Sequence, residues 1–296
     1  MKTPQEDSKI IDLNTPGAVN VAELSRQRLA FVGGGVMAEA MVAGLLERKL
    51  VEPGAVWVSH PRAHRADQLA ERFGIHATTS NREAALAAQI VVLCVKPQRL
   101  SSVLNELKGK LDNDKLVVSI VTGASLNNIA TRLLHEAVVR TMPNTPAQIG
   151  QGLTVWAATP AVTPHQRDLV RALLGALGRE MIFEEEKFVD MATAISGSGP
   201  AYVFLLMEAM MDAAVHLGFS RQDARELVTS TLLGSVLFAQ ESQKHPAELR
   251  NMVTSPNGTS AEALYQLEKG GMRTVISKAI YAAYQKTGVL SSMINQ

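Results

Sequence analysis

The sequence lacks the features of a disulfide-stabilised, membrane-spanning or nucleic-acid-binding protein. Its 296 residues include one cysteine, Cys94, so no disulfide can form within the chain. Because Cys94 lies in the apolar run 90–95, we expect a buried structural thiol and a cytoplasmic, reducing environment. No apolar run approaches the roughly 20 residues that span a bilayer. A formal net charge of +1 gives no electrostatic case for nucleic acid or for an acidic membrane surface.

Residues 1–27 also lack the apolar core of a signal peptide. They carry polar and charged residues interrupted by prolines and a glycine, and we expect a loosely ordered polar tail, which supports no functional claim. No period of about 20 to 50 residues repeats along the chain. The remaining length is enough for two domains and a large core.

The first part of the chain, residues 28–184, alternates short apolar runs with helical segments. This alternation is the pattern of βαβ units and predicts an α/β domain with a Rossmann-like, doubly wound sheet. Helices are expected over 40–50 and 163–177. The expected strands are 29–32, 55–59, 74–78, 90–95, 116–121, 137–141, 152–157 and 178–183.

A glycine-rich turn joins the first expected strand to the first helix. Residues 33–38 read Gly-Gly-Gly-Val-Met-Ala, a G-x-G-x-x-A pattern between strand and helix. Gly33 allows a tight turn, Gly35 lets a pyrophosphate approach the backbone, and Ala38 lets the helix pack closely on the sheet. Glycines can also serve a turn alone, but this context favours a dinucleotide-binding site.

The end of the second strand indicates which dinucleotide is preferred. A site for NAD usually has Asp or Glu here to bind the ribose 2′-hydroxyl, but Ser59 is followed by no carboxylate through Arg65. The Ser59 hydroxyl with the guanidiniums of Arg62 and Arg65 suits a 2′-phosphate, which favours NADP. The alternative is that both arginines are ordinary surface residues. His60 and His64 have the spacing of a metal pair, but no further ligand stands nearby and we expect no metal site.

Two further segments follow expected strands, at the edge where open α/β sheets bind ligands. Lys96 and Pro97 follow the fourth strand, and we expect Lys96 to contact the cofactor, unless it is only a solvent-facing charge. In the loop 142–147, two prolines bracket Asn144 and Thr145 and hold the loop stiff. This loop would line a nicotinamide pocket or serve only as a turn.

From residue 185 to residue 296 the strand pattern is absent and the chain is expected to be all helical. The small residues of 192–202 would let two backbones, or a backbone and a cofactor, approach closely. So much apolar helix is difficult to bury within one chain, which favours pairing with a second copy. The expected helices are 202–216, 221–240, 246–252, 259–268 and 272–286.

A turn near the carboxyl end, Ser255-Pro-Asn-Gly258, leads into a further helix. The sequence predicts a capping box between Thr259 and Glu262 at the start of that helix. Free N–H groups there, with the hydroxyls of Ser255, Thr259 and Ser260 around them, would suit a small carboxylate. The alternative is that the hydroxyls only cap the helix and serve the turn.

Three segments together resemble the pyrroline-5-carboxylate reductase family. They are the glycine turn 33–38, the run Ser-Gly-Ser-Gly-Pro-Ala-Tyr at 196–202, and the segment 253–264, in that order and at matching spacing. Residues 95–97 and 142–146 also match the family pattern. The resemblance extends from Leu29 to the carboxyl end, and the segment 253–264 is its most specific part.

The resemblance implies a 6-phosphogluconate-dehydrogenase-like architecture, in which a Rossmann domain is followed by a helical dimerisation domain. It implies an interlocked homodimer, which in some members assembles into a decamer. The implied reaction is the reduction of L-1-pyrroline-5-carboxylate to L-proline in proline biosynthesis, with NADPH or, alternatively, NADH. The implied cofactor-binding residues are Gly33, Gly35, Val36, Met37, Ala38, Ser59, Arg62, Val95, Lys96, Pro97 and Asn144. The implied substrate-binding residues are Val253, Ser255, Gly258, Thr259 and Ser260, with the Ser260 hydroxyl near the imine nitrogen as the catalytic group.

The chain departs from the family pattern at three places. Asn257 stands where many members have Gly, and Ser260 where many have Thr. Residues 121–123 read Val-Thr-Gly where Ala-Ala-Gly is common. These departures affect the turn geometry, the rotamer of the Ser260 hydroxyl and the wall of the cofactor site.

Two other functions are compatible with parts of the pattern. Another reductase on the same scaffold, such as a β-hydroxyacid dehydrogenase, would use a lysine on the helical domain, but none stands near 196–202 or 255–260. A non-catalytic NADP-binding regulator would bind the cofactor without turnover. Reduction of a cyclic imine needs only a hydride, a proton and an oriented substrate, so it requires neither a metal nor a catalytic triad.

Overall fold

The computed structural model describes residues 21–294, with side chains from Glu23 onward, and its described residues form two compact units. One unit extends to Gly197 and also includes the chain from Tyr284, and the other is Ser198–Ala283. The sequence pattern predicted the boundary between the two domains at residue 185, where the charged segment 184–186 ends the strand pattern.

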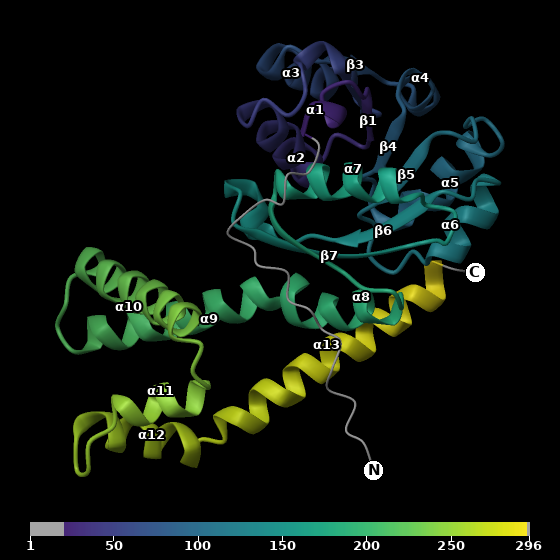
Figure 1. Ribbon diagram of the computed structural model, residues 1–296. Coiled ribbons are helices and arrows are strands. Elements are labelled where there is room, and N and C mark those ends of the chain that lie inside the picture. Colours follow the sequence, from purple (N-terminus) through teal and green to yellow (C-terminus); the bar gives the residue numbers. More distant parts are fainter. Residues whose placement is uncertain (1–20, 295–296) are drawn as a thin grey trace, which may run out of the picture. The chain divides into compact units, whose positions relative to one another are not determined.

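The first unit is built on one eight-stranded sheet (Figure 1). Its strand order is β3-β2-β1-β4-β5-β6-β7-β8, and every neighbouring pair is parallel except β6 with β7. The predicted Rossmann-like, doubly wound sheet is therefore confirmed. The strands are β1 (Leu29–Val32), β2 (Val56–Ser59), β3 (His76–Thr78), β4 (Ile90–Leu93), β5 (Leu116–Ser119), β6 (Val138–Met142), β7 (Gly152–Ala158) and β8 (Gly178–Ile182).

Helices cover both faces of this sheet because its strands are apolar on both faces. Phe31 of β1 belongs to a core with side chains of α2, α3 and α7, whereas its neighbour Val32 belongs to a second core with α4, α5 and α6. The helices of this unit are α1 (Val21–Leu24), α2 (Val36–Glu47), α3 (Ala63–Phe73), α4 (Asn81–Ala87), α5 (Pro97–Leu107), α6 (Leu126–Leu133), α7 (Pro164–Gly175) and α8 (Lys187–Ala192). Shorter turns are η1 (Pro53–Ala55), η2 (Thr145–Ile149) and the π-helical η3 (Thr193–Gly197).

The predicted polar tail 1–27 needs a correction at its end. Leu24 of α1 is fully buried, and the Glu23 carboxylate pairs with the His165 side chain at 2.8 Å. The chain before β1 is therefore packed onto α7 from α1 onward. Residues 1–20 of the predicted tail lie outside the described residues.

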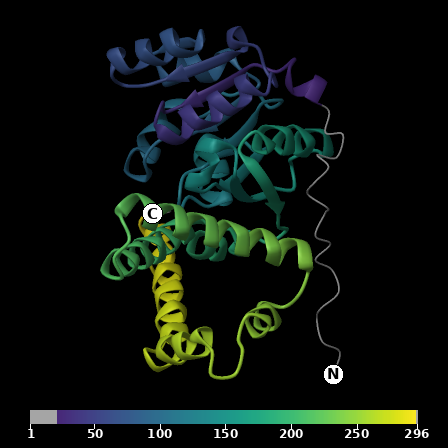
Figure 2. The same ribbon diagram turned by 90° about the vertical axis from the view of Figure 1, so that its left-hand side faces the viewer.

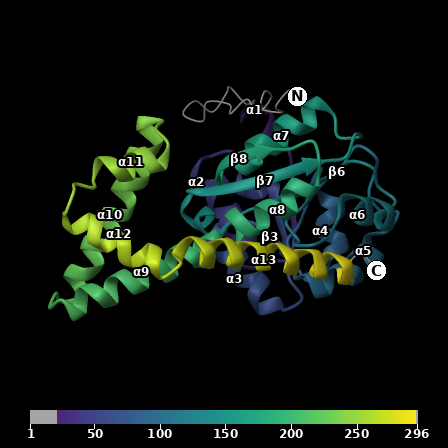
Figure 3. The ribbon, with the colours of Figure 1, turned by 90° about the horizontal axis from the view of Figure 1, so that it is seen from below.

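The second unit is helical, as predicted. α9 and α10 pack against each other, and Figure 3 shows α11 and α12 as separate shorter helices. α13 is one continuous helix, drawn in yellow in Figure 2, whose last turns are counted with the first unit. None of the described helices is long and apolar enough to span a bilayer. The helices are α9 (Gly199–His216), α10 (Arg221–Ser242), α11 (Pro246–Met252), α12 (Thr259–Lys269) and α13 (Met272–Ile294).

Few residues of the second unit are buried. Ala224 and Val228 of α10 are the buried residues of its described part, and α9, α11 and α12 contain none. Large apolar side chains on α9 and α10 are exposed instead, including Leu205, Leu233 and Phe238. Monomeric proteins rarely expose so many apolar side chains on neighbouring helices.

Candidate functional site

The glycine turn after β1 is fixed by the ends of two neighbouring strands. The N–H groups of Gly33 and Gly34 donate to the Ser59 carbonyl at the end of β2, at 3.1 and 3.0 Å. Gly33 has a φ of +106°, and a Cβ there would lie 2.9 Å from the Cys94 carbonyl carbon and oxygen. Only glycine satisfies both conditions, so the predicted tight turn at Gly33 is present.

The turn opens toward solvent at its third glycine. A Cβ at Gly35 would meet no heavy atom within 4 Å, and the residue is exposed. α2 begins at Val36 with Gly35 as an N-cap that lacks a side-chain hydrogen bond. The first N–H groups of a helix have no partner within the helix, so this end can receive an anion such as a pyrophosphate. Open space and free donors therefore fit a dinucleotide.

The first turn of α2 separates solvent-facing from core-facing residues. Val36 is exposed beside the open end of the turn, whereas Met37 packs partly against the core. Ala38 is buried, which agrees with its predicted role of letting the helix lie close to the sheet.

Ser59 differs from its predicted role. Its side chain is fully buried, and its hydroxyl donates to the Asn81 Oδ1 at 2.8 Å. The hydroxyl is therefore not available to a 2′-phosphate. Ser59 instead holds the glycine turn through its carbonyl and links β2 to the start of α4. The sequence could not show this hydrogen bond because Asn81 follows Ser59 by 22 residues, beyond α3 and β3.

The two arginines expected at the 2′-phosphate also have different environments. Arg62 is exposed at the N-cap of α3, and its guanidinium has no partner among the described residues. Its backbone N–H donates to the His60 Nδ1 at 3.2 Å. Arg65, in the first turn of α3, is paired with Glu39 of α2. Arg62 is thus the free cation of the pair, and the expectation of two available guanidiniums is wrong.

The chain after β4 lies directly against the glycine turn. A Cβ at Gly33 would lie 3.0 Å from the Val95 Cγ1. Lys96 is the N-cap of α5 and is exposed, and Pro97 occupies the first helical position. The Lys96 ammonium has no partner within the described residues, so it can reach an anion near the turn. Desolvation raises the pKa of the Cys94 thiol, which keeps it protonated and unsuited to nucleophilic chemistry.

Asn144 also differs from its predicted role. Its Oδ1 accepts from the Leu153 N–H at 2.9 Å, and its Nδ2 donates to the Ser196 carbonyl at 3.1 Å. Because both ends of the amide are engaged, Asn144 braces the loop after β6 against β7 and η3 rather than facing a ligand. Gly197 allows this close packing, since a Cβ there would lie 2.8 Å from the Met142 Cε.

The π-helical segment η3 was not predicted. It covers Thr193–Gly197, within the run of small residues 192–202 that the sequence marked as a place of close backbone approach. Single-turn π-helices occur frequently at functional sites. The side chains of Thr193 and Ser196 donate to carbonyls one turn earlier, at 2.8 and 3.0 Å. The only sequence signal for this segment was its small, hydroxyl-rich composition.

In the second unit, the predicted turn before α12 is present. The Gly258 N–H donates to the Ser255 carbonyl at 3.1 Å, and Asn257 has a φ of +58°. Asparagine tolerates this conformation better than other non-glycine residues, so the departure at Asn257 preserves the turn. A Cβ at Gly258 would overlap the Ser255 hydroxyl, so a larger residue here would displace the Ser255 side chain.

The predicted capping box at this turn is wrong. The N-cap of α12 is Gly258, with no side-chain capping hydrogen bond, and Thr259 is the first helical residue. The Gly258 carbonyl accepts from the N–H groups of Ala261 and Glu262, at 3.1 and 3.2 Å. Among the described residues, the N–H groups of Thr259 and Ser260 have no acceptor. The helix start therefore offers free donors, as a carboxylate site requires, although no threonine cap forms it.

The five predicted substrate-binding residues all lie on or beside this turn. Val253 is exposed at the end of α11, Ser255 and Thr259 are exposed, and Gly258 and Ser260 are partly buried. Thr254, between them, is occupied because its hydroxyl donates to the Arg250 carbonyl at 2.6 Å.

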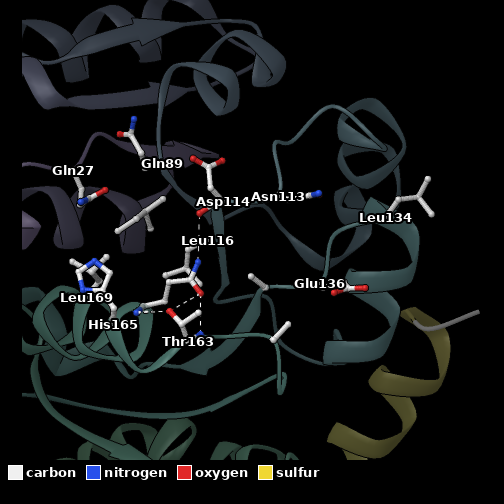
Figure 4. A pocket seen from close by; sticks show the side chains of 14 residues that line it. Gln27, Gln89, Asn113, Asp114, Leu116, Leu134, Glu136, Thr163, His165 and Leu169 are labelled. Atoms are coloured by element: carbon white, nitrogen blue, oxygen red, sulfur yellow. Dashed lines mark hydrogen bonds between the residues drawn. The ribbon is translucent and has the colours of Figure 1, made fainter.

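A separate hollow of about 640 Å³ lies at the opposite edge of the sheet (Figure 4). Ile90 and Leu116, which begin β4 and β5, form part of its wall, and the Thr163 and His165 side chains border it. Parallel sheets bind ligands at the carboxyl ends of their strands, where the glycine turn lies. This hollow is therefore distinct from the candidate site.

Two family models match the chain. One, described as pyrroline-5-carboxylate reductase dimerisation, matches residues 186–290, and one described as NADP oxidoreductase, coenzyme F420-dependent, matches residues 28–123. The pyrroline-5-carboxylate reductase of Synechocystis sp. is 40% identical over 260 residues, which are 88% of this chain and 97% of that protein. The chain belongs to the pyrroline-5-carboxylate reductase family. The Pseudomonas aeruginosa reductase is 39% identical over 274 residues, 92% of this chain and 100% of that protein.

Solved structures of pyrroline-5-carboxylate reductases share the fold. The Coxiella burnetii enzyme has a TM-score of 0.82 and 36% identity, covering 90% of this chain and 98% of that one. The Plasmodium falciparum enzyme, with NADP bound, has a TM-score of 0.83 and 31% identity, covering 90% of this chain and 99% of that one.

Proposed function

We propose that the chain reduces L-1-pyrroline-5-carboxylate to L-proline, the last step of proline biosynthesis, with NADPH as hydride donor and NADH as the alternative. Membership of the pyrroline-5-carboxylate reductase family makes the chain an NAD(P)H-dependent oxidoreductase. The observation that carries the site assignment is the start of α12, where two free N–H groups adjoin the hydroxyls of Ser255 and Ser260.

The cofactor is assigned to the glycine turn and its surroundings. Gly33 shapes the turn, Gly35 leaves room for the pyrophosphate, and the free N–H groups of α2 donate to it. The exposed guanidinium of Arg62 would bind the 2′-phosphate of NADPH, and Lys96 would contact a cofactor phosphate. When bound, the cofactor supplies the hydride that the imine carbon accepts.

The substrate carboxylate is assigned to the start of α12. The N–H groups of Thr259 and Ser260 would donate to it, and the positive end of the helix dipole would stabilise it. Such a helix start contributes roughly 0.3 to 1 kcal/mol at an exposed site and up to about 2 kcal/mol when partly buried. The Ser260 hydroxyl is a weak acid, so its role is to orient the imine nitrogen or to relay a proton to it.

The helical unit is assigned to self-association as an interlocked homodimer. The dimerisation model matches this part of the chain, and its exposed apolar side chains suit a second copy. Assembly of dimers into a decamer and a cytoplasmic location are further proposals. Size-exclusion chromatography with light scattering would measure the assembly, and cell fractionation would measure the location.

One assay tests the reaction. The purified chain is mixed with NADPH and pyrroline-5-carboxylate as the sole acceptor, and the loss of NADPH absorbance is followed while L-proline is measured by chromatography. We expect one L-proline for each NADPH oxidised. Cofactor binding without turnover would favour the regulator, and turnover only with β-hydroxyacids would favour the other class of reductase.

A further inference from the structure

Three arginines stand on α3, on the side of the sheet unit where the cofactor is assigned, and one glutamate binds two of them. Glu39, in the first turn of α2, forms ion pairs with Arg65 through one carboxylate oxygen and with Arg72 through the other. The side chain of Glu39 is 21% exposed, and those of Arg65 and Arg72 are 30% and 62% exposed. Within the described part of the chain, the guanidinium of Arg62 has no partner. Glu39 therefore pairs with two of the three guanidiniums and leaves that of Arg62 available to a ligand.

These cations lie close to the glycine turn. A Cβ at Gly34 would lie 2.7 Å from the Leu69 Cδ1 and 3.6 Å from the His60 Cβ, so α3 and the segment before it touch the turn. α2 and α3 are in contact along this side of the sheet (Figure 1). The Arg65 N–H donates to the Arg62 carbonyl at 3.0 Å, so the two arginines share the first turn of α3. A 2′-phosphate at Arg62 would thus lie within reach of the Arg65 side chain if that side chain were released.

We infer that Glu39 sets the selectivity between NADPH and NADH by holding Arg65 and Arg72 away from the 2′-phosphate. This inference rests on the proposed role of Arg62. Glu39 acts in two ways: its pairs withdraw two guanidiniums from the phosphate, and its own negative charge opposes a phosphate dianion nearby. NADH carries a hydroxyl at the same position, so neither effect on a 2′-phosphate applies to it. Any effect of the Glu39 charge on the pyrophosphate is common to both cofactors and leaves the ratio between them unchanged. Glu39 is accordingly a specificity-determining residue that keeps the preference for NADPH moderate.

The first experiment replaces the carboxylate by an amide of the same shape. Glu39→Gln should raise the ratio of kcat/KM for NADPH to kcat/KM for NADH by about fivefold, the size expected for one unit charge acting in water on a dianion about 8 Å away. Adding salt should reduce the gain, because the groups are partly exposed. Glu47→Gln is the matched control, since Glu47 ends the same helix and is exposed. It should leave the ratio unchanged.

A double-mutant cycle tests whether Arg65 carries the effect. In the native chain, Arg65→Ala should change the ratio by less than about twofold, because Glu39 already engages the guanidinium. In the Glu39→Gln background, Arg65→Ala should remove most of the rise in the ratio that Glu39→Gln causes. The two substitutions would then be non-additive, which measures the coupling between Glu39 and Arg65. An equal loss with both cofactors in Glu39→Gln would mean that Glu39 only braces α2 against α3, and the inference would be wrong.

Two further readouts keep the inference separate from the proposed function. Dissociation constants for NADPH and NADH, measured from their fluorescence, test Glu39 even if pyrroline-5-carboxylate is not the substrate. Arg62→Ala tests the phosphate assignment itself: a ratio unchanged by this variant would overturn the role of Arg62. If Glu39→Gln does not fold, Arg65→Ala in the native chain tests the inference instead. If Arg65→Ala lowers the ratio of kcat/KM for NADPH to kcat/KM for NADH as much as Arg62→Ala does, Arg65 already binds the phosphate and the inference is wrong.

Discussion

The two units bury their apolar side chains very differently. In the sheet unit, Phe31 and Trp156 are completely inaccessible and belong to the core that α2, α3 and α7 cover. In the helical unit, Leu205 and Leu233 are 66% and 62% exposed, and α9 contains no buried residue. The first unit is complete within one chain, whereas the second presents a surface that needs a partner.

The same contrast holds for the two turns assigned to ligands. The glycine turn is held by strand ends and by packing, with Gly33 against the Cys94 carbonyl group and Gly34 against Leu69. The turn before α12 is held by its own backbone, through the hydrogen bond between Gly258 and Ser255. A dinucleotide is therefore assigned to a turn fixed by the fold, and a small carboxylate to a turn fixed by local sequence.

The largest expected effect separates two phenylalanines. Phe31→Ala should lower the free energy of unfolding by about 3 to 5 kcal/mol, because it leaves a cavity in a closed core. Phe238→Ala should cost about 1 kcal/mol or less at low protein concentration, since this side chain is 52% exposed, and should instead weaken self-association. Urea unfolding at several protein concentrations measures both. If both variants lost the same free energy of unfolding at every protein concentration, the two units would not differ in how they bury apolar side chains.

The next effect concerns two glycines of the sheet unit. Gly33→Ala places a Cβ against the Cys94 carbonyl at a positive φ, so the turn must shift, and kcat/KM for NADPH should fall about 100-fold. Gly175→Ala, where a Cβ would meet nothing within 4 Å at the end of α7, should leave kcat/KM unchanged. Steady-state kinetics of both variants would measure the difference in kcat/KM for NADPH. Native activity in Gly33→Ala would remove the turn from the cofactor site.

A smaller effect is expected at the other turn. Ser260→Ala should lower kcat about tenfold to 100-fold and leave the KM for NADPH nearly unchanged, because the hydroxyl is assigned to the imine and not to the cofactor. Ser292→Ala, an exposed hydroxyl on α13, is the matched control and should not alter kcat. Unchanged turnover in Ser260→Ala would exclude its hydroxyl from the mechanism.

A last effect lies in the pH dependence of stability. Burial raises the pKa of the Cys94 thiol, so the unfolded chain loses this proton at lower pH than the folded chain does. The folded state then binds more protons, and stability falls as the pH rises above the unfolded pKa, by about 1.4 kcal/mol for each pH unit. Cys94→Ala should lack this component between about pH 8.5 and 10. Parallel alkaline profiles of the two chains, measured by urea unfolding, would refute the prediction.

The sheet and its glycine turn could be predicted because their signals are local. The apolar run 90–95 and the pattern 33–38 report on their own conformation, and the structure has a strand and a turn at these places. The strand itself ends earlier, at Leu93, because Pro97 and the helix after it turn the chain back. Helix starts were less certain, since the cap of α12 depends on the conformation of Gly258 rather than on the hydroxyl of Thr259.

The errors at the cofactor site share a different cause. Ser59 is hydrogen-bonded to Asn81, and Arg65 is ion-paired with Glu39. Asn144 donates to the carbonyl of Ser196, which is also distant in the sequence. Each prediction rested on the chemistry of a side chain and could not include a partner distant in the sequence. Arg62 and Lys96 have no competing partner among the described residues, so their roles at the cofactor stay predictions.

The position of the substrate carboxylate is the feature on which the proposed function depends most directly. A crystal structure of the chain with NADP and L-proline measures this position. We expect the proline carboxylate oxygens within about 3 Å of the N–H groups of Thr259 and Ser260. A proline carboxylate bound elsewhere, with these two N–H groups hydrated, would contradict the account.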